Sequence, residues 1–369
     1  MLKAHDAGIR TRPRRTMKSA VIGTGRIAIE HLRFLKNQND VDIVAVCDLS
    51  PALAEYAAKQ FGAQNAITDY PTMLRTFAPD VVHVCTPAAT HASVARDCLS
   101  SGSNVIVEKP IASCFDEFEN LWEMAQVRGL LITEDHNYLF NPPIPEMKEI
   151  IAEGTLGAVK EIEVRAAVHA HSPGNRYADV NLPHASHALP AGVIHEFITH
   201  MCYLVHHFLP DAKAGVDFQQ ATAFWNNHGG ENSFKFDDLD AVIVTHGVHV
   251  HLRFCSSTYP PNLDIAVRCS NGSMYADVWH PYLRIERPSR VRQLSAIASQ
   301  WSGGWGLVRS SLRNLRDRFS GVTTYEGLSK FLSLTYDAIR TGGTPPVGYD
   351  EISATCKMID DLVSRAETK

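Results

Sequence analysis

The stretch Val21-Ile22-Gly23-Thr24-Gly25-Arg26-Ile27-Ala28 decides the fold of the N-terminal half of this chain. It closes a short apolar run at 19–22 and opens a helical pattern that continues to residue 35. A strand, a Gly-x-Gly-x-x-Ala turn and a helix in this order predict a dinucleotide-binding unit. Gly23 permits the tight turn, Gly25 lets the backbone approach a pyrophosphate, and Ala28 lets the helix pack on its strand. The free N–H groups at the helix start attract phosphate, so Thr24 and Ile27 join the candidate cofactor contacts.

An acidic residue follows the turn at the spacing that such a site requires. Asp48 comes directly after the next apolar run, 41–47, about 20 residues beyond the turn. A carboxylate there can accept hydrogen bonds from the ribose hydroxyls of the adenosine. Leu49 and Ser50 come next rather than an arginine, which favours NAD over NADP. Arg26 could contact a phosphate, so the sequence leaves NADP open.

Strand and helix patterns alternate through the N-terminal half. Apolar strands are expected at 19–22, 41–47, 81–85, 104–108 and 130–133. Helices are expected at 26–37, 51–61, 71–77, 91–101 and 115–128. Alternation of this kind predicts a parallel, doubly wound sheet, so we assign residues 18–140 to a Rossmann domain.

The pattern changes near Asn141-Pro142-Pro143. A helix is expected at 144–153, and after it apolar residues recur with a period of two at 159–168 and 241–254. Strands at 263–269 and 273–278 follow, joined by the hairpin signal Asn271-Gly272. The sequence therefore predicts an α/β chain whose second domain, 141–369, is α+β with a large, mostly antiparallel sheet. We place a helical insertion at about 290–325 and the last helix at 350–366.

The composition is that of an ordinary globular protein. Of the 369 residues, 45% are hydrophobic and 20% are charged, and the net charge of −5 argues against nucleic-acid binding. No apolar stretch approaches the roughly 20 residues of a membrane span. The eight cysteines form no Cys-x-x-Cys pair, which favours reduced thiols and a cytoplasmic location.

Residues 1–17 differ from the rest of the chain. Lys3, Arg10, Arg12, Arg14 and Arg15 crowd a segment without an apolar period. We interpret it as a disordered basic tail, or as sequence upstream of a start at Met17. The alternative is an arm for organelle targeting or for binding an acidic surface.

Glu108-Lys109-Pro110 ends the fifth predicted strand, and it carries a family resemblance. Thr86-Pro87-x-x-x-His91, Ser101-Gly102-x-Asn104 and Gly154-Thr-Leu-Gly157 accompany it. With the glycine turn and the α+β half, these motifs resemble the Gfo/Idh/MocA family of NAD(P)-dependent oxidoreductases, over nearly the whole chain from Ser19. The resemblance implies a dehydrogenase acting on CH–OH groups, in a homodimer or homotetramer. The resemblance also implies that the cofactor-binding residues include Thr86, Pro87, His91, Glu108 and Lys109.

Three residues are expected to carry the catalysis: Lys109, Glu196 and His200. Lys109 stands at the carboxyl end of a parallel strand, where ligands bind, and its ammonium can stabilise an alkoxide. Glu196 and His200 are four residues apart in a helical segment, so they share a face and can hydrogen-bond. His200 would accept the hydroxyl proton while Glu196 fixes its tautomer. The family usually has aspartate where Glu196 stands.

The same helix suggests a zinc site, which the spacing opposes. The zinc-protease motif needs two histidines four residues apart, whereas His195 and His200 are five apart. Five residues correspond to roughly 140° around a helix, so these rings do not share a face. We therefore expect no metal, and His195 to be a packed or polar contact.

Other polar residues are candidates for the substrate pocket. His184 and His187 precede the helix of His200, and Tyr138 follows the last Rossmann strand, where it could equally pack at a hinge. The remaining histidines are interpreted as polar groups of a sheet face or hydrogen-bonded interior groups. They include His169 and His171 at a strand end, and His246, His249 and His251 in one strand.

The insertion at 290–325 carries an apolar stripe at helical spacing, Val308, Leu312, Leu315 and Phe319. A basic face lies beside it, with Arg309, Arg313 and Arg316, and Trp301 and Trp305 precede it in a loop that contains glycines. We interpret this helix as packed with a solvated face. A peripheral membrane contact through 301–319 or a clamp on a diphosphate-bearing substrate are the alternatives.

Together these features predict an NAD-dependent oxidoreductase that acts on a secondary alcohol of a sugar, a cyclitol or a nucleotide sugar. Two alternatives stay open. One is a dinucleotide-sensing regulator that kept the fold and lost turnover. The other is an enzyme of the same fold with a non-sugar substrate.

Overall fold

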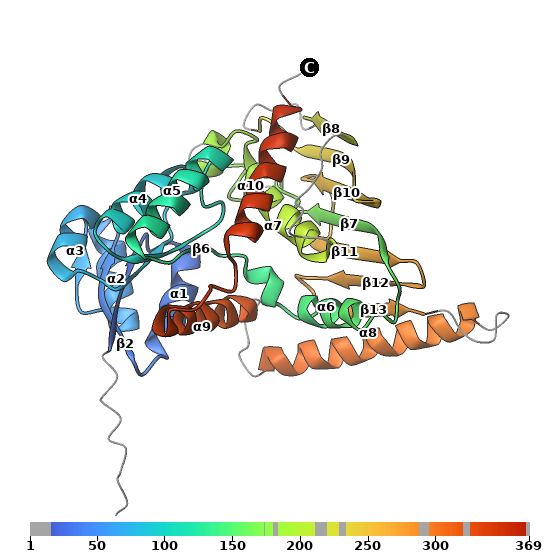
Figure 1. The fold of residues 1–369 in the computed structure, drawn as a ribbon, viewed down its shortest axis with the longest axis horizontal. Helices are drawn as coiled ribbons and strands as arrows, with labels where there is room; N and C mark the ends of the chain where they lie inside the picture. The colour runs from blue at the N-terminus through green and yellow to red at the C-terminus, as the bar shows by residue number, and fades with distance from the viewer. Residues whose placement is uncertain are drawn as a thin grey trace, which may run out of the picture.

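The computed structural model describes residues 16–172, 174–179, 184–210, 220–228, 234–287, 295–319 and 325–366. The predicted basic tail therefore lies outside the described residues, apart from Thr16 and Met17. Two sheets, each with its own helices, make up the chain (Figure 1). This confirms the predicted α/β class with a Rossmann half and a second, mostly antiparallel sheet.

The first sheet is parallel throughout, in the order β3-β2-β1-β4-β5-β6. Its strands are β1 (Met17–Ile22), β2 (Val41–Cys47), β3 (Ala66–Ile67), β4 (Val81–Val84), β5 (Asn104–Val107) and β6 (Ile132–Glu134). Its helices are α1 (Arg26–Lys36), α2 (Pro51–Phe61), α3 (Tyr70–Phe77), α4 (His91–Ser100) and α5 (Phe115–Arg128), with η1 (Ala88–Thr90) before α4. The strand order reverses between β1 and β4, which is where such sheets bind ligands at their carboxyl ends.

Local signals explain where several of these helices begin and end. Ser50 and Asp69 accept hydrogen bonds from the first turns of α2 and α3, and proline occupies an early position in both helices. Gly62 and Gly129 end α2 and α5 in the left-handed conformation.

The second sheet has the order β13-β12-β11-β7-β10-β9-β8 and is antiparallel except for the β7–β10 pair. Its strands are β7 (Val159–Ala167), β8 (Gln220–Asn226), β9 (Asp238–Thr245), β10 (Val248–Cys255), β11 (Asn262–Cys269), β12 (Gly272–Asp277) and β13 (Tyr282–Glu286). The period of two at 241–254 belongs to a hairpin, not to one strand. His246 and Gly247 form its turn, both with positive φ.

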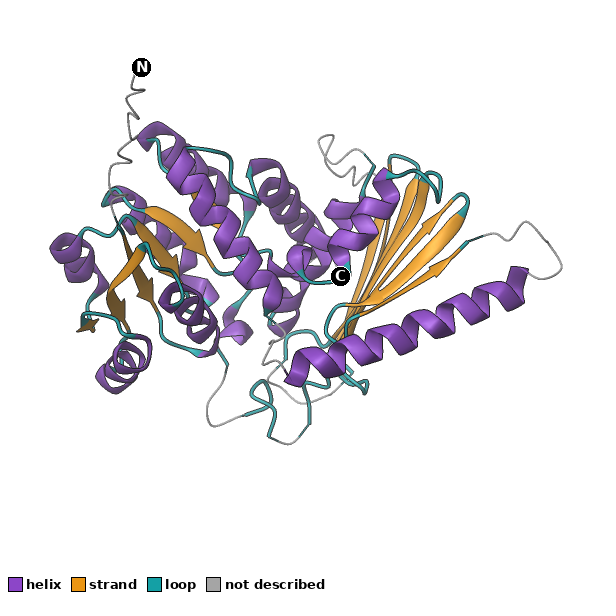
Figure 2. Ribbon diagram, turned by 90° about the horizontal axis from the view of Figure 1, so that it is seen from below, coloured by secondary structure: helices purple, strands orange, loops and turns teal. Residues whose placement is uncertain are grey.

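The helices that follow the Rossmann sheet cover one face of the second sheet, lie along its edge or connect the two halves (Figure 2). They are α6 (Ile144–Ala152), α7 (Val193–Phe208), α8 (Ser295–Phe319), α9 (Glu326–Thr341) and α10 (Tyr349–Ser364), with η2 (Asn137–Phe140) and η3 (Ala185–Ala188) in the connections. α7 contacts β7 and β10, and α10 lies against both α7 and α5. α7 is thereby held at the junction of the halves, which positions its polar residues.

The C-terminal part of the chain returns to the Rossmann half through α9. This helix contacts α1, and Arg340 of α9 forms an ion pair with Asp40 at 2.8 Å. Tyr336 of α9 is fully buried and hydrogen-bonds to His83 of β4 at 2.8 Å. The N-terminal core is thus completed by a helix more than 180 residues further along the chain.

Candidate active site

The glycine turn has the geometry that its sequence requires. Gly23 has φ +86°, and a Cβ there would lie 2.5 Å from the backbone oxygen of Cys85. Gly25 stands at the N-terminus of α1, and a Cβ there would meet nothing within 4 Å. Gly23 is therefore required by the fold itself, whereas the space beside Gly25 and the free helix N-terminus suit a phosphate-bearing ligand.

Asp48 is tied to this turn. One oxygen of its carboxylate accepts hydrogen bonds from the Thr24 backbone N–H at 2.9 Å and from the Thr24 hydroxyl at 2.8 Å. The other accepts from the Ser50 backbone N–H at 2.9 Å. The carboxylate is held next to the glycine turn, at the edge where a ribose would bind.

The other predicted cofactor contacts differ in their exposure. Arg26 and Pro87 are exposed, and Ile27 and Thr86 are half-buried. His91 is buried, with Nδ1 2.7 Å from the backbone oxygen of Pro110 and Nε2 2.7 Å from that of Thr86. Both of its ring nitrogens thus face the backbone, so His91 joins the two loops and does not reach their surface, contrary to our expectation of a direct cofactor contact.

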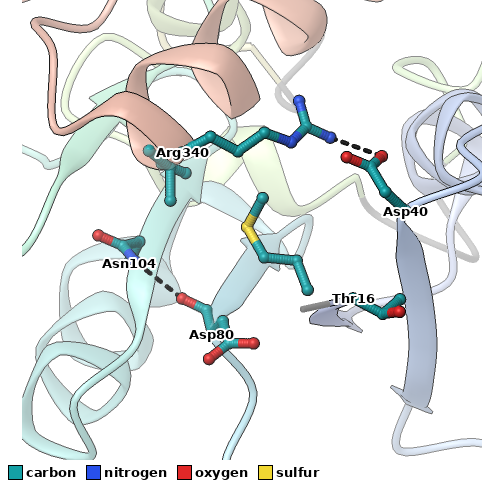
Figure 3. Close-up of a pocket in the computed structure, with 7 residues that line it drawn as sticks. Thr16, Asp40, Asp80, Asn104 and Arg340 are labelled. Atoms are coloured by element: carbon teal, nitrogen blue, oxygen red, sulfur yellow. Dashed lines mark hydrogen bonds and ion pairs between the residues drawn. The ribbon is translucent and has the colours of Figure 1, made fainter. Parts of the chain in front are cut away.

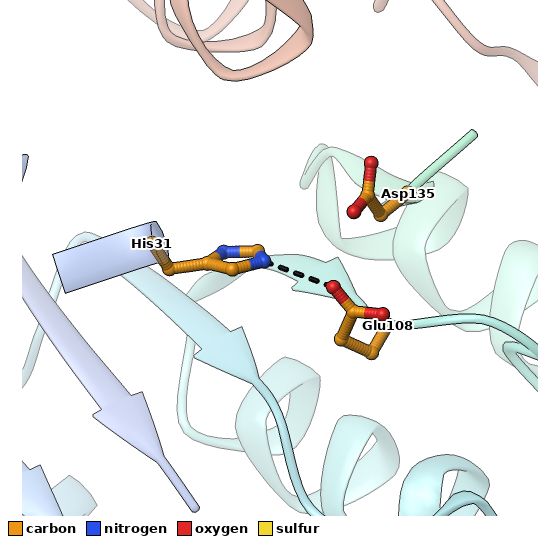
Figure 4. A group of neighbouring side chains, drawn as sticks. All are labelled: His31, Glu108 and Asp135. Carbon is orange, nitrogen blue, oxygen red and sulfur yellow. Dashed lines mark hydrogen bonds and ion pairs between the residues drawn. The ribbon is translucent and has the colours of Figure 1, made fainter. Parts of the chain in front are cut away.

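Glu108 also points inward rather than toward a ligand (Figure 4). Its Oε1 lies 3.0 Å from Nε2 of His31 on α1, and both residues are buried. Asp135, directly after β6, completes a group whose ligand-capable atoms lie within 4.8 Å of one another. Sequence spacing gave no signal for this group, because its three members come from α1 and from the ends of two strands.

Protonation explains how two carboxyl groups share this buried place. Burial and the neighbouring Glu108 raise the pKa of Asp135 well above its usual range. Burial opposes ionisation of Glu108 as well, but the His31 hydrogen bond and the Lys109 charge outweigh it and lower the pKa of Glu108. A neutral Asp135 can share its proton with the charged Glu108. This explains how the two carboxyl groups lie side by side in a buried place without a cation between them.

The cluster continues into the core as a chain of hydrogen bonds. Nδ1 of His31 lies 2.7 Å from Nδ1 of His83, whose Nε2 lies 2.8 Å from the Tyr336 hydroxyl. That hydroxyl is 2.6 Å from the Ser19 hydroxyl. Burial lowers the pKa of His83 well below its usual range, and the neighbouring His31 adds to this effect. These polar groups are buried but paired, which is the condition under which a core tolerates them.

Lys109 and Glu196 meet between the two halves of the chain. The Lys109 ammonium donates a hydrogen bond to the Glu196 backbone oxygen at 3.1 Å and lies 3.8 Å from its carboxylate. Only 14% of the Lys109 side chain is exposed. An ammonium from the end of β5 is therefore fixed against α7.

The Glu196 carboxylate is surrounded by basic side chains rather than paired with His200. The Arg176 guanidinium lies 3.1 Å from it, and Nδ1 of His184 lies 3.8 Å from it. Burial alone would raise the pKa of Glu196, but Lys109, Arg176 and His184 outweigh it and lower that pKa. The carboxylate is thus kept ionised, and it balances a group of positive charges.

His200 is held by Tyr203 instead of Glu196. Its Nδ1 lies 2.7 Å from the Tyr203 hydroxyl, one helical turn further along α7. This corrects the expectation that Glu196 fixes the tautomer of His200. Burial, with smaller contributions from Lys109 and His136, lowers the pKa of His200 well below its usual range. The imidazole is therefore neutral at physiological pH, as a proton acceptor must be.

Tyr138 packs directly on His200, with their ring centroids 4.4 Å apart. Its hydroxyl accepts a hydrogen bond from the Trp279 indole N–H at 3.0 Å. Because Trp279 follows β12, this contact joins the Rossmann end to the second sheet. This contact agrees with the hinge interpretation of Tyr138, and a contact of Tyr138 with the substrate stays a prediction.

The structure separates the two histidines of the 184–188 loop. His184 faces Glu196, as described above, whereas Nε2 of His187 bonds to the backbone oxygen of Tyr177 at 2.9 Å. The ring of His187 also lies against Phe234. η3 contacts η1, so the loop reaches the Rossmann edge, but only His184 is directed toward the Lys109–Glu196 pair.

His195 is buried and takes no part in this group. Burial lowers its pKa to about 4, and Lys109 adds to the effect. Among the described residues, the group that could supply three metal ligands is the His31, Glu108 and Asp135 cluster, and His195 is outside it.

A cavity of about 460 Å³ lies at the opposite edge of the Rossmann sheet (Figure 3). It is lined by Thr16, Met17, Asp40, Asp80, Asn104, Ile339 and Arg340. Met17 and Asn104 are the first residues of β1 and β5, so the cavity is at the amino ends of the strands. Ligands of such sheets bind at the carboxyl ends, and the cavity is accordingly separate from the candidate site.

Sequence reasoning missed Arg176, Tyr203 and Asp135. Tyr203 could have been found, because it follows His200 by three residues on one helix face. Arg176 is in an irregular loop and Asp135 acts through partners distant in sequence, so neither carries a local signal.

Comparison with known proteins agrees with this architecture. Residues 17–136 match the model of the Gfo/Idh/MocA oxidoreductase family, described as an NAD-binding Rossmann fold. A D-glucoside 3-dehydrogenase of Escherichia coli K12 is 29% identical over 159 residues, which are 43% of this chain and 45% of that protein. A 4-carboxy-2-hydroxymuconate-6-semialdehyde dehydrogenase of a Sphingobium species is 32% identical over 149 residues, 40% of this chain and 47% of that protein.

These sequence matches span about half the length of the curated relatives. The fold likeness extends further. A UDP-N-acetylglucosamine 3-dehydrogenase of Acidithiobacillus ferrooxidans is similar with a TM-score of 0.70 at 16% identity, over 95% of this chain and 97% of that one. The second half of the chain thus shares the fold of these oxidoreductases as well as the first.

Proposed function

We propose that this chain belongs to the Gfo/Idh/MocA oxidoreductase family and is an NAD-dependent dehydrogenase acting on a secondary alcohol of a sugar, a cyclitol or a nucleotide sugar. The observation that carries the proposal is the meeting of Lys109 and Glu196 at the carboxyl edge of the dinucleotide-binding sheet, one turn of α7 before the neutral His200. The sugar dehydrogenases among the similar proteins support the same substrate class.

The residues of the glycine turn fit a dinucleotide. The space beside Gly25 and the free N-terminus of α1 suit a pyrophosphate, and Asp48 is placed for a ribose. Bound NAD would supply the acceptor for the substrate hydride. NADP stays open, since Arg26 is exposed at the helix start.

His200 is the proposed proton acceptor. If Nδ1 carries the ring hydrogen and donates it to Tyr203, the lone pair of Nε2 is available for the substrate hydroxyl proton. Lys109 would stabilise the developing alkoxide with its ammonium. In this proposal Glu196 fixes the Lys109 ammonium and balances the charge of Arg176, and Tyr138 and His184 contact the substrate.

The face of the second sheet opposite α7 and α10 is proposed as the surface for a homodimer or homotetramer. Charged residues occupy this sheet, including Arg268, which pairs with Glu163 at 3.0 Å. Size-exclusion chromatography with light scattering on the full chain gives the oligomeric state directly.

The decisive experiment separates an enzyme from a sensor. NADH fluorescence is titrated with the protein, and a panel of sugars, cyclitols and nucleotide sugars is then followed by NADH absorbance. We expect binding and turnover on at least one polyol. Binding without turnover on the panel would favour the dinucleotide-sensing regulator. Turnover restricted to a non-sugar semialdehyde, the substrate class in the name of one similar protein, would favour the other alternative.

A further inference from the structure

Helix α8 packs on the protein through its small residues. Gly303 and Ser310 are buried, and a Cβ at Gly303 would lie 3.1 Å from the Arg284 side chain. A Cβ at Gly306 would lie 3.2 Å from the backbone oxygen of Leu283, and the Asn314 side chain donates to the Pro281 oxygen at 2.9 Å. The helix therefore lies along β13, the edge strand of the second sheet (Figures 1 and 2). Trp301 and Trp305 belong to this helix rather than to a preceding loop.

The large apolar residues of α8 face away from this contact. Six of them follow one line along the helix: Trp301, Trp305, Val308, Leu312, Leu315 and Phe319. Each of these six side chains is between 50% and 86% exposed. Their spacing alternates between four and three residues, so they form one continuous stripe. A surface helix ordinarily buries such a stripe against the protein, whereas α8 packs through its small residues and exposes the apolar stripe.

Basic residues border the stripe. Residues 295–319 contain four arginines and one aspartate, in a chain whose net charge is −5. Arg309 and Arg316 are exposed and each directly follows a stripe residue, Val308 and Leu315. An occupant of this surface should therefore offer an apolar layer bordered by negative charge.

A second copy of the helix does not meet this requirement. Among the positions beside the stripe whose side chains the structure describes, Gly304, Arg309, Ser311 and Arg316, none is acidic. A pair of helices joined along the stripe therefore supplies no negative charge to the basic border of the stripe. A bilayer with anionic headgroups provides both the apolar layer and the negative charge.

We propose that α8 lies flat on an anionic phospholipid surface, with its tryptophan, leucine and phenylalanine side chains at the headgroup boundary. Tryptophan is enriched at this boundary, and interfacial helices combine such an apolar face with arginine. No helix within the described part of the chain is long and apolar enough to cross a bilayer. The contact is thus peripheral, and it leaves the Lys109–Glu196 site on other elements.

The test is sedimentation of the full chain with vesicles of phosphatidylcholine alone and of phosphatidylcholine with one third phosphatidylglycerol. Binding is expected to the anionic vesicles and to weaken with salt. Leu312→Gln with Leu315→Gln should reduce it by more than about tenfold, because two apolar side chains no longer enter the boundary. Arg309→Gln should reduce it about fivefold.

Matched controls use equally exposed positions elsewhere. Val127→Gln on α5, where Val127 is 88% exposed, and Arg96→Gln on α4 should leave vesicle binding unchanged. NADH binding by all variants reports that they are folded. Absence of sedimentation with anionic vesicles would overturn the proposal. Self-association of the protein without lipid would also overturn the proposal if the double substitution of Leu312 and Leu315 abolished it, because the stripe would then join two copies of the chain.

Discussion

The Lys109 ammonium lies 3.8 Å from the Glu196 carboxylate and donates to the Glu196 backbone oxygen at 3.1 Å. The two residues are 87 positions apart and come from the end of a Rossmann strand and from α7, the helix that packs on the second sheet. This contact fixes the position of the Lys109 ammonium, and the charge of Lys109 helps to lower the pKa of His200. The proposed chemistry depends on that arrangement.

Lys109→Met should abolish turnover while dinucleotide binding persists. The substitution removes the charge proposed to stabilise the alkoxide, and we expect kcat to fall by about 10²- to 10³-fold. NADH affinity, measured by fluorescence, should stay within about threefold, because the pyrophosphate and ribose contacts are elsewhere. Lys330→Met, at an exposed position of α9, is the control. Equal loss of binding and turnover in Lys109→Met would contradict the assigned role.

Alanine substitutions at the two turn glycines should have different effects. Gly23→Ala places a Cβ 2.5 Å from a backbone oxygen at positive φ, so it should lower the free energy of unfolding by about 2–4 kcal/mol. Gly25→Ala meets no protein atom within 4 Å. It should leave the melting temperature of the free protein unchanged yet weaken NADH binding by about tenfold or more, because the methyl group occupies the phosphate space. Unaltered NADH affinity in Gly25→Ala would place the pyrophosphate elsewhere.

Tyr203→Phe should reduce kcat without a comparable change in KM. The hydroxyl is the partner of His200 Nδ1 at 2.7 Å, and its loss removes the support for the tautomer that accepts a proton at Nε2. We expect a decrease of about tenfold in kcat, in the range of one buried hydrogen bond. Tyr56→Phe, at an exposed position, serves as the control. A wild-type kcat for Tyr203→Phe would show that this tautomer has another origin.

The stability of the folded chain should fall as the pH decreases below about 6.5. Among the described residues, burial lowers the pKa of six histidines, to about 4 for His195 and about 3 for His207, and to lower values than usual for His83, His91, His184 and His200. Above pH 6.5 these rings are neutral in both states, so they impose no penalty. Below it the unfolded chain binds protons that the folded chain excludes, at about 1.4 kcal/mol per pH unit for each ring.

Asp135, Asp264 and Asp360 act in the opposite direction, because a raised pKa of a carboxyl group favours the folded state at low pH, but they are three groups against six histidines. The melting temperature should therefore decrease between pH 7 and pH 5, with a smaller slope for His207→Gln and an unchanged slope for the exposed His280→Gln. A melting temperature that is flat over this range would refute the effect of the buried histidines.

The sequence by itself determined the class of fold and the presence of a dinucleotide-binding turn. The Gly23-x-Gly25 turn, Asp48 and the alternation of strands and helices depend on local backbone conformation and on burial, both of which leave periodic traces in a sequence. The predicted parallel sheet, the antiparallel second sheet and the NAD-binding Rossmann fold are confirmed. The assignment of Lys109, Glu196 and His200 to catalysis stays a prediction, although the structure brings Lys109 and Glu196 together.

Only the tertiary structure decided the partners of these side chains. Helical spacing placed Glu196 and His200 on one face, but spacing does not give the direction of a side chain when stronger partners come from distant segments. Arg176 and Lys109 attract the Glu196 carboxylate, and the Tyr203 hydroxyl lies within hydrogen-bonding distance of the His200 imidazole. The burial of Glu108 against His31 and the outward face of α8 have the same cause. Both depend on which surfaces meet after folding, and long-range packing leaves no period in the sequence.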